Sequence, residues 1–172
     1  MWQQLTEELT GTFAAVPLSV AATRLGAAIL LGALIGFERE RKEKPAGLRT
    51  HMLVSMAAAL FVITGIEISE LDFSGGGESQ GQQVDPLRLI EAVTAGVAFL
   101  AAGLIFTSGG RVVNVTTGAS LWLAGAIGLS CGAGQIPLAA LAAVTVVVTL
   151  WAIGKVERRV GTHPESGADS ED

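Results

Sequence analysis

Long apolar runs separated by short polar turns fill most of the chain between Leu18 and Ile153. A helix rises about 1.5 Å per residue and the hydrocarbon core of a bilayer is about 30 Å thick, so about 20 apolar residues cross it. Because no water reaches the backbone inside a bilayer, such runs fold as helices. The pattern predicts an all-α membrane protein, a polytopic helical bundle of about five transmembrane helices. The predicted spans are 18–37, 50–68, 87–107, 115–131 and 137–153.

The polar segments predict how this bundle is oriented. Short loops rich in Lys and Arg stay on the cytoplasmic side, and the turn between the first two spans is strongly basic. Every Lys and Arg except Arg24 and Arg88 falls on that side if the N-terminus is outside and the C-terminus is cytoplasmic. The predicted domains are an outer interfacial amphipathic segment (1–17), a transmembrane domain (18–154) and a cytoplasmic, basic-then-acidic disordered tail (155–172).

Composition argues against catalysis. Half of the 172 residues are hydrophobic and 16% are charged, with two histidines and a single cysteine, Cys131, which we expect to be a small buried packing residue. No glycine-rich phosphate loop, zinc-ligand spacing or nucleophile beside a base is present in the sequence. We therefore expect no enzymatic activity, no cofactor and no metal site. The lipid bilayer is the expected environment, and no nucleic-acid partner is expected.

Charged residues near the outer ends of two spans form the first candidate site. Arg24 lies inside the first span, where a charge costs about 2.5–3.5 kcal/mol at the centre of a helix and less near its end. Asp85 and Arg88 begin the third span at the same level, so Arg24 and Asp85 are expected partners. The group is either an ion-pair cluster that fixes helix ends or a site for a cation or a protein partner.

Polar residues around the basic turn form the second candidate site, on the inner side. The helical hairpin brings the end of the first span next to the start of the second, and the fourth span begins on the same side. His51 titrates near neutral pH in an ordinary environment, whereas hydroxyl and amide side chains can simply cap a helix. Structural and functional roles both remain open. The expected members are Glu38, Arg49, Thr50, His51, Asn114, Thr116 and Thr117.

Small residues recur at four-residue intervals in the first span, at Ala28, Gly32 and Gly36. Such a face lets another helix approach closely and drives helix association in lipid. It could join two copies in a homodimer, or it could reflect only the abundance of Ala and Gly in membrane helices. Further helix-packing positions are expected at Gly96, Gly103, Trp122 and Gly128.

Several segments resemble the MgtC/SapB family of bacterial inner-membrane proteins. They include Gly36-Phe-Glu38-Arg-Glu and Ala46-Gly-Leu-Arg-Thr-His-Met-Leu-Val54, in order and with suitable spacing. The resemblance continues through Asp85-Pro-Leu-Arg88, Gly96 to Ile105, and Thr116 to Gly128. The sequence departs from the family at Ala98 and Ala101, where the family has glycines, and at Asn114-Val-Thr-Thr-Gly-Ala, where the family has Gly-Leu-Thr-Thr-Ala-Ala. The added methyl groups are expected to loosen a close helix contact.

The resemblance implies a multi-pass protein of the bacterial inner membrane, linked to magnesium homeostasis under magnesium limitation and to virulence. It implies a non-enzymatic regulator of other membrane proteins, with the F-type ATP synthase as one such partner. Longer members also carry a soluble C-terminal domain that this sequence does not include. The alternative function is transport of Mg²⁺, another cation or a small solute, along a path that joins the outer and inner polar clusters.

Overall fold

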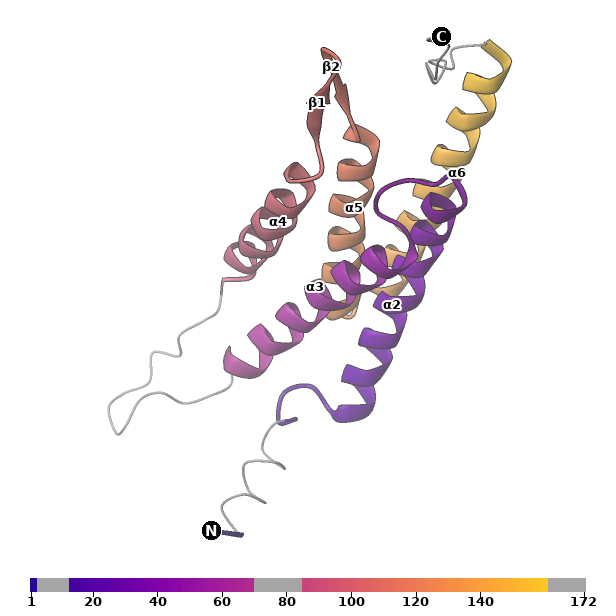
Figure 1. Cartoon of the computed structure of the whole chain (residues 1–172). Coiled ribbons are helices and arrows are strands. Elements are labelled where there is room, and N and C mark those ends of the chain that lie inside the picture. The colour runs from indigo at the N-terminus through magenta and orange to yellow at the C-terminus, as the bar shows by residue number, and fades with distance from the viewer. Residues whose placement is uncertain (3–12, 70–84, 161–172) are drawn as a thin grey trace.

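The computed structural model describes residues 1–2, 13–69 and 85–160, and the helices in these ranges form a bundle (Figure 1). The predicted class, an all-α membrane protein, is confirmed. Most of the predicted amphipathic segment, the loop after the second span and the end of the tail lie outside the described residues. The elements are α2 (Leu18–Arg41), α3 (Leu48–Ser69), α4 (Pro86–Ala102), β1 (Phe106–Ser108), β2 (Arg111–Val113), α5 (Val115–Gly132) and α6 (Ile136–Val160).

The first two helices form the predicted hairpin. α2 continues past Phe37 to Arg41, and α3 already begins at Leu48, so the connecting turn is shorter than the sequence suggested. The Glu40 carboxylate accepts a hydrogen bond from the Leu48 N–H at 2.6 Å. It thereby satisfies one of the backbone donors that the start of a helix leaves without an intrahelical partner.

The third predicted span, 87–107, is partly wrong because its helix ends at Ala102. The chain then forms an antiparallel hairpin of β1 and β2, in which Phe106 pairs with Val113. Gly109 and Gly110 between the strands have φ angles of +57° and +76°, the conformation that a tight two-residue hairpin turn needs. A short apolar run fits a helix end and a strand equally well, so hydrophobicity alone could not place this boundary.

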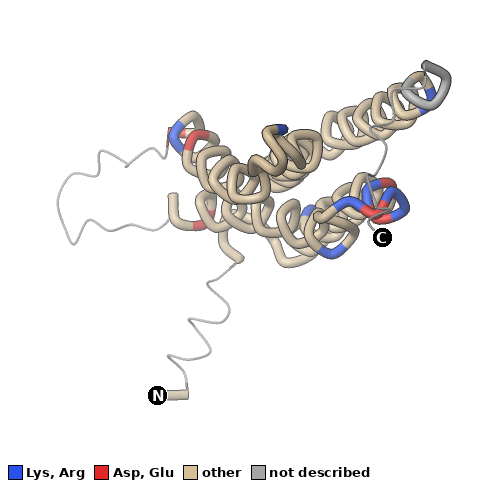
Figure 2. Tube along the Cα trace, turned by 45° about the horizontal axis from the view of Figure 1, so that its top comes forward, with Lys and Arg blue, Asp and Glu red and all other residues tan. Residues whose placement is uncertain are grey.

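α5 lies at the centre of the bundle and contacts α2, α3, α4 and α6. α4 packs against α5 and α3 on the side away from α6 (Figure 1). α6 packs against α2 and α5 and runs on to Val160, so the start of the predicted tail is helical. Figure 2 shows Lys and Arg positions, with acidic positions among them, gathered at the α2–α3 turn, and a further basic position near the far end of α6.

The largest buried apolar cluster joins α2, α3, α5 and α6. It contains Ala28, Ile35, Ala59, Ile127 and Cys131, each at most 2% exposed. Most of these side chains are small, so the helix axes approach closely. Cys131 is buried and unpaired, which confirms its predicted role in packing.

Four of the described helices, α2, α3, α5 and α6, are long and apolar enough to cross a membrane. α4 has 17 residues, about 25 Å of helix, which is just short of a hydrocarbon core of about 30 Å. Large apolar side chains such as Leu30, Phe61 and Leu141 lie exposed on the outside of the bundle. A bilayer is the medium that covers such a surface without cost.

Candidate functional site

The centre of the inner polar cluster is His51, in the first turns of α3. Its side chain is fully buried between α3 and α5. Nδ1 lies 2.8 Å from the Gly47 carbonyl oxygen, and Nε2 lies 3.1 Å from Ser120 Oγ on α5. A carbonyl oxygen can only accept, so Nδ1 carries a proton. The second ring nitrogen therefore faces the serine hydroxyl.

The Ser120 hydroxyl can serve His51 in either protonation state. Ser120 Oγ also lies 2.9 Å from the Thr117 carbonyl oxygen, and a hydroxyl has one proton to donate. When the imidazole is neutral, the hydroxyl donates to Nε2. When the imidazole is protonated, Nε2 donates to Oγ and the hydroxyl proton turns to the Thr117 carbonyl. Rotation of one hydroxyl thus keeps this buried group hydrogen-bonded.

Glycines bring α2 and α5 against α3 around this histidine. A Cβ on Gly32 would lie 2.7 Å from the His51 carbonyl oxygen, and one on Gly36 would lie 2.7 Å from Leu48 Cα. A Cβ on Gly128 would overlap the Ser55 carbonyl. Side chains at these positions would force the helices apart.

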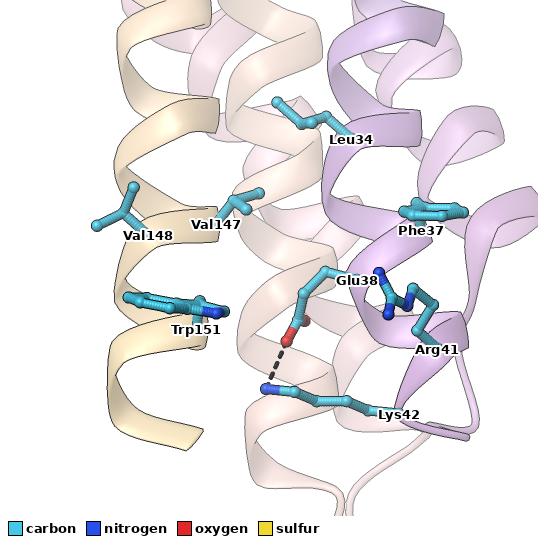
Figure 3. Close-up of a pocket in the computed structure, with 8 residues that line it drawn as sticks. All are labelled: Leu34, Phe37, Glu38, Arg41, Lys42, Val147, Val148 and Trp151. Carbon is cyan, nitrogen blue, oxygen red and sulfur yellow. Dashed lines mark ion pairs between the residues drawn. The ribbon is translucent and has the colours of Figure 1, made fainter. Parts of the chain in front are cut away.

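Glu38 lies nearby on α2 but belongs to a separate ion-pair group. Its carboxylate pairs with Arg39 Nε at 2.7 Å and with Lys42 Nζ at 2.5 Å, the latter shown in Figure 3. Lys42 Nζ also donates to the Leu150 carbonyl of α6 at 3.2 Å. No hydrogen bond or ion pair joins Glu38 to Arg49 or His51 in the structure. The group ties the end of α2 to α6.

The remaining inner candidates divide into buried and exposed positions. Thr117 is 1% exposed and enters the His51 group through its carbonyl. Asn114 adopts a left-handed backbone conformation and donates from Nδ2 to the Leu104 carbonyl at 3.2 Å, so it fixes the turn after β2 instead of capping α5. Arg49 and Thr116 are exposed, and Thr50 is half-buried.

The outer candidates are not brought together as predicted. Arg24 Nη1 donates to the Gly132 carbonyl at the end of α5, at 2.8 Å, and not to Asp85. The last carbonyls of a helix have no intrahelical partner and carry partial negative charge, so they attract a guanidinium. Asp85 caps its own helix, with Oδ1 accepting from the Leu87 N–H at 2.9 Å. Arg88 is exposed.

The predicted packing residues have two outcomes. Ala28, Gly32, Gly36 and Gly128 are buried at helix contacts, as predicted. The first three face α3 of the same chain, so this face is not free to bind a second copy. The other three predicted packing positions are exposed at the surface of the bundle, and their role stays a prediction: Gly96, Gly103 and Trp122.

The alanine at position 101 is buried at the contact between α4 and α5. Ala101 is 6% exposed, and Gly118 lies opposite it on α5. A Cβ on Gly118 would lie 3.1 Å from the Ala101 carbonyl oxygen. The missing side chain at Gly118 therefore leaves room for the Ile105 side chain and for the α4 backbone at Ala101. Ala98, the other alanine in place of a family glycine, is exposed.

Sequence reasoning missed three buried polar residues, Arg39, Ser55 and Ser120. Ser55 follows His51 by one helical turn, and Ser120 follows Thr117 by three residues, so helical spacing places them on the same faces as the predicted residues. Ser55 Oγ has no hydrogen-bond partner among the described residues. The helical period could have found both serines. It could not have shown that Arg39 turns inward to Glu38.

The His51 group offers hydrogen bonds and an imidazole that can exchange a proton. Among the described residues, no group of three His, Cys, Asp or Glu side chains is placed to hold a metal ion. The imidazole and its serine are enclosed by three helices, and a substrate cannot reach them without helix separation. The arrangement fits a buried hydrogen bond, between His51 and Ser120, that holds α3 against α5.

The apolar length of the helices and their close glycine contacts define a polytopic helical membrane protein. A family model described as the MgtC family matches residues 25–159, and the chain belongs to this family.

Curated relatives agree with this assignment. The protein named Protein MgtC from Brucella abortus is 41% identical over 131 residues, which cover 76% of this chain and 50% of the relative. Protein MgtC from Salmonella typhimurium is 34% identical over 140 residues, covering 81% of this chain and 55% of the relative. The chain thus spans about half the length of the curated relatives it matches. No solved structure matches it.

Proposed function

We propose that this chain is a non-enzymatic regulator of other membrane proteins in the bacterial inner membrane. The observation that carries the proposal is the apolar layer between the two ends of the bundle. Arg24 lies at one end of this layer, where it binds the last carbonyl of α5, and Glu38 lies near the other end of α2. His51 lies at the inner edge of the layer and Ser55 lies within it, both packed against Gly32. The layer is built from Ala28, Ile35, Ala59, Ile127 and Cys131, each at most 2% exposed.

Transport along the bundle fits this packing poorly. An ion or polar solute needs groups that replace its hydration shell, and uncompensated charges inside a membrane are costly. The outer residues of the hypothetical path, Arg24 and Asp85, hydrogen-bond to separate helix ends. The inner residues Glu38 and His51 have separate partners. A regulator needs no path, only a surface that a partner recognises.

A groove between α3 and α4 is the surface that we assign to a partner helix. Its volume is about 590 Å³, and its lining is almost entirely apolar. Ala57, Gly65 and Gly96 lie in it among larger apolar residues, and Gly96 has open space where a side chain would be. Small residues let a second helix approach closely in lipid, where packing drives association.

The physiological role is proposed from the family. Its resemblance implies regulation linked to magnesium limitation and virulence, and it points to the F-type ATP synthase as a partner. The relatives share the name Protein MgtC, which states their family and names no activity. We therefore infer that the groove between α3 and α4 binds a transmembrane helix of such a complex.

Flux measurements in liposomes test whether the packed apolar layer prevents transport of Mg²⁺. Purified full-length chain is reconstituted into vesicles loaded with a Mg²⁺-sensitive dye, beside protein-free vesicles and vesicles with a known Mg²⁺ channel. We expect Mg²⁺ entry at the rate of protein-free vesicles. Entry that rises with protein content and is lost in Asp85→Ala would overturn the proposal in favour of transport.

Inverted bacterial membrane vesicles test the partner. We expect added chain to lower ATP-driven proton pumping by the ATP synthase. Gly96→Trp fills the groove and should abolish the effect, because its side chain enters open space and leaves the fold intact. The control Leu141→Trp places the same indole side chain on the exposed face of α6 and should still inhibit. Equal inhibition by both variants would show that the groove is not the binding surface.

A further inference from the structure

A second cleft lies between the inner ends of α2 and α6, away from the groove of α3 and α4 (Figure 3). Its volume is about 490 Å³. Leu34 and Phe37 of α2 form one wall, and Val147, Val148 and Trp151 of α6 form the other. Lys42 spans the gap beside Glu38, as Figure 3 shows. The cleft is apolar at one end and charged at the other.

The apolar end is open to the outside of the bundle. Phe37 is 56% exposed, Trp151 is 57% exposed and Val148 is 56% exposed, although all three are large apolar side chains in membrane-crossing helices. The medium around such side chains is hydrocarbon. An acyl chain can therefore enter this part of the cleft from the side.

The charged end carries an excess of cations. Glu38 is already paired with Arg39 and Lys42. Arg41 and Lys155 form no ion pair with the described residues. Each lies over an aromatic ring of its own helix: the Arg41 guanidinium is 5.8 Å from the centroid of Phe37, and Lys155 Nζ is 5.0 Å from that of Trp151. Both walls thus end in an aromatic ring with a cation on its face.

The nearest other carboxylate on α2 belongs to a different contact. Glu40 accepts from the Leu48 N–H in the α2–α3 turn and does not line the cleft. Arg39 and Lys44 line a neighbouring hollow that shares Lys42 with the cleft, so they add positive charge behind it. Among the residues that line the cleft, Arg41 and Lys42 outnumber Glu38, so the net charge of the lining is positive.

We propose that the cleft binds one phospholipid with an anionic headgroup. The headgroup phosphate lies against Arg41 and Lys42, which line the cleft, with Lys155 over Trp151 at its rim, and an acyl chain follows Leu34 and Val148. Aromatic rings at the level of the headgroups are typical of membrane interfaces, and basic pockets between transmembrane helices bind anionic headgroups. A free phosphate would satisfy the cations but would leave the apolar walls unused. The lipid uses both ends.

Lipid titrations of the full-length chain in neutral detergent, read by native mass spectrometry, test the proposal. The probes are dioleoyl phosphatidylglycerol and dioleoyl phosphatidylcholine, which differ in headgroup charge and share their chains. We expect the first lipid to bind at least about tenfold more tightly, since each nearby Lys or Arg contributes about 1 kcal/mol toward an anionic headgroup. Equal binding of the two lipids would overturn the proposal.

Two variants and a soluble competitor locate the binding site. Arg41→Gln combined with Lys155→Gln should remove most of the preference for phosphatidylglycerol. Arg49→Gln combined with Arg111→Gln removes two exposed cations outside the cleft and should retain it. Glycerophosphoglycerol, the same headgroup without chains, should fail to compete at equal concentration. Loss of preference in the control variant, or competition by the soluble headgroup, would overturn the assignment.

Discussion

Individual glycines decide how closely these helices pack. At Gly32, Gly36 and Gly128 the space for a Cβ is occupied by atoms of α3, whereas Gly96 has nothing within 4 Å. Glycine costs a helix up to about 1 kcal/mol relative to alanine, so its presence at the three close contacts is explained by packing. The same residue type thus has different roles on α5 and α4.

This difference predicts opposite effects of two alanine substitutions. Gly128→Ala should lower the free energy of unfolding by about 2–3 kcal/mol, because the new methyl group overlaps the Ser55 carbonyl and α3 must shift. Gly96→Ala should leave it unchanged or raise it slightly, because helix propensity improves without a clash. Unfolding in mixed micelles with increasing SDS, followed by circular dichroism, measures both. Equal effects would contradict the close contact at Gly128.

Two serines on α5 allow the hydrogen bond to His51 to be compared with a hydrogen bond inside one helix. Ser120 bonds to buried His51 as well as to its own helix, whereas Ser130 Oγ bonds only to the Ala126 carbonyl of its own helix. Ser120→Ala leaves a buried ring nitrogen without a partner and should cost about 1–3 kcal/mol. Ser130→Ala should cost less than about 0.5 kcal/mol. The same SDS titration compares them, and equal losses would argue against a role for the imidazole contact.

Residue-scale prediction from sequence succeeded where spacing was decisive. The four-residue repeat of Ala28, Gly32 and Gly36 correctly predicted a close helix contact, but the repeat alone could not tell that its partner is α3 of the same chain. Trp122, a predicted packing position, is 47% exposed at the surface of the bundle. In lipid, an apolar side chain is equally suited to the bundle interior and its surface, so hydrophobicity does not reveal which way a helix faces.

At the scale of elements, helix ends are held by charged and polar side chains. Glu40 bonds to the start of α3, Asp85 caps α4, and Arg24 binds the last carbonyl of α5. Glu67 accepts from the Ala15 and Val16 N–H groups before α2. The sequence identified Arg24 and Asp85 as costly or polar positions. The predicted pairing of Arg24 with Asp85 is wrong because a sequence shows side chains and does not show which backbone carbonyl of a helix end lies within reach.

The contact of Arg24 can be measured directly. Arg24→Met removes its hydrogen bond to Gly132 and should lower the free energy of unfolding by about 1–2 kcal/mol, since a hydrogen bond from a charged donor contributes more than a neutral one. The control Arg88→Met changes an exposed arginine and should have an effect below about 0.5 kcal/mol. A larger loss for Arg88→Met would indicate that the outer site is organised around α4.

Apolar length predicted the helices of the whole molecule well, because a bilayer leaves a chain few ways to satisfy its backbone. The predicted starts and ends agree with α2, α3, α5 and α6 to within a few residues, except that α6 runs further. The exception is α4 with its hairpin. There the apolar run continued through Ile105 and Phe106, and only the glycine pair at 109–110 signalled a turn. How the helices pack on one another required the structure.

Cysteine labelling in intact spheroplasts tests the orientation and whether short α4 crosses the membrane. The turn after α2 and the β-hairpin lie at one end of the bundle, and the turn between α5 and α6 lies at the other (Figure 1). If the basic end is cytoplasmic, Gln135→Cys reacts with an impermeant maleimide from outside, whereas Lys44→Cys reacts only after permeabilisation. Native Cys131 is fully buried and gives little background in the folded protein.

Ser108→Cys in the hairpin then decides the number of crossings. We expect it to behave like Lys44→Cys, because α4 is about 25 Å long and a local thinning of the bilayer accommodates a helix of that length. Reaction of Ser108→Cys from outside, with Lys44→Cys still protected, would mean that α4 returns without crossing. The β1–β2 hairpin would then lie on the membrane surface opposite the basic α2–α3 turn. The bundle places the two at the same end, so this result would contradict the packing of α5. If α4 crosses the membrane, the β1–β2 hairpin, the His51–Ser120 hydrogen bond and the cleft between α2 and α6 all lie near the same membrane surface.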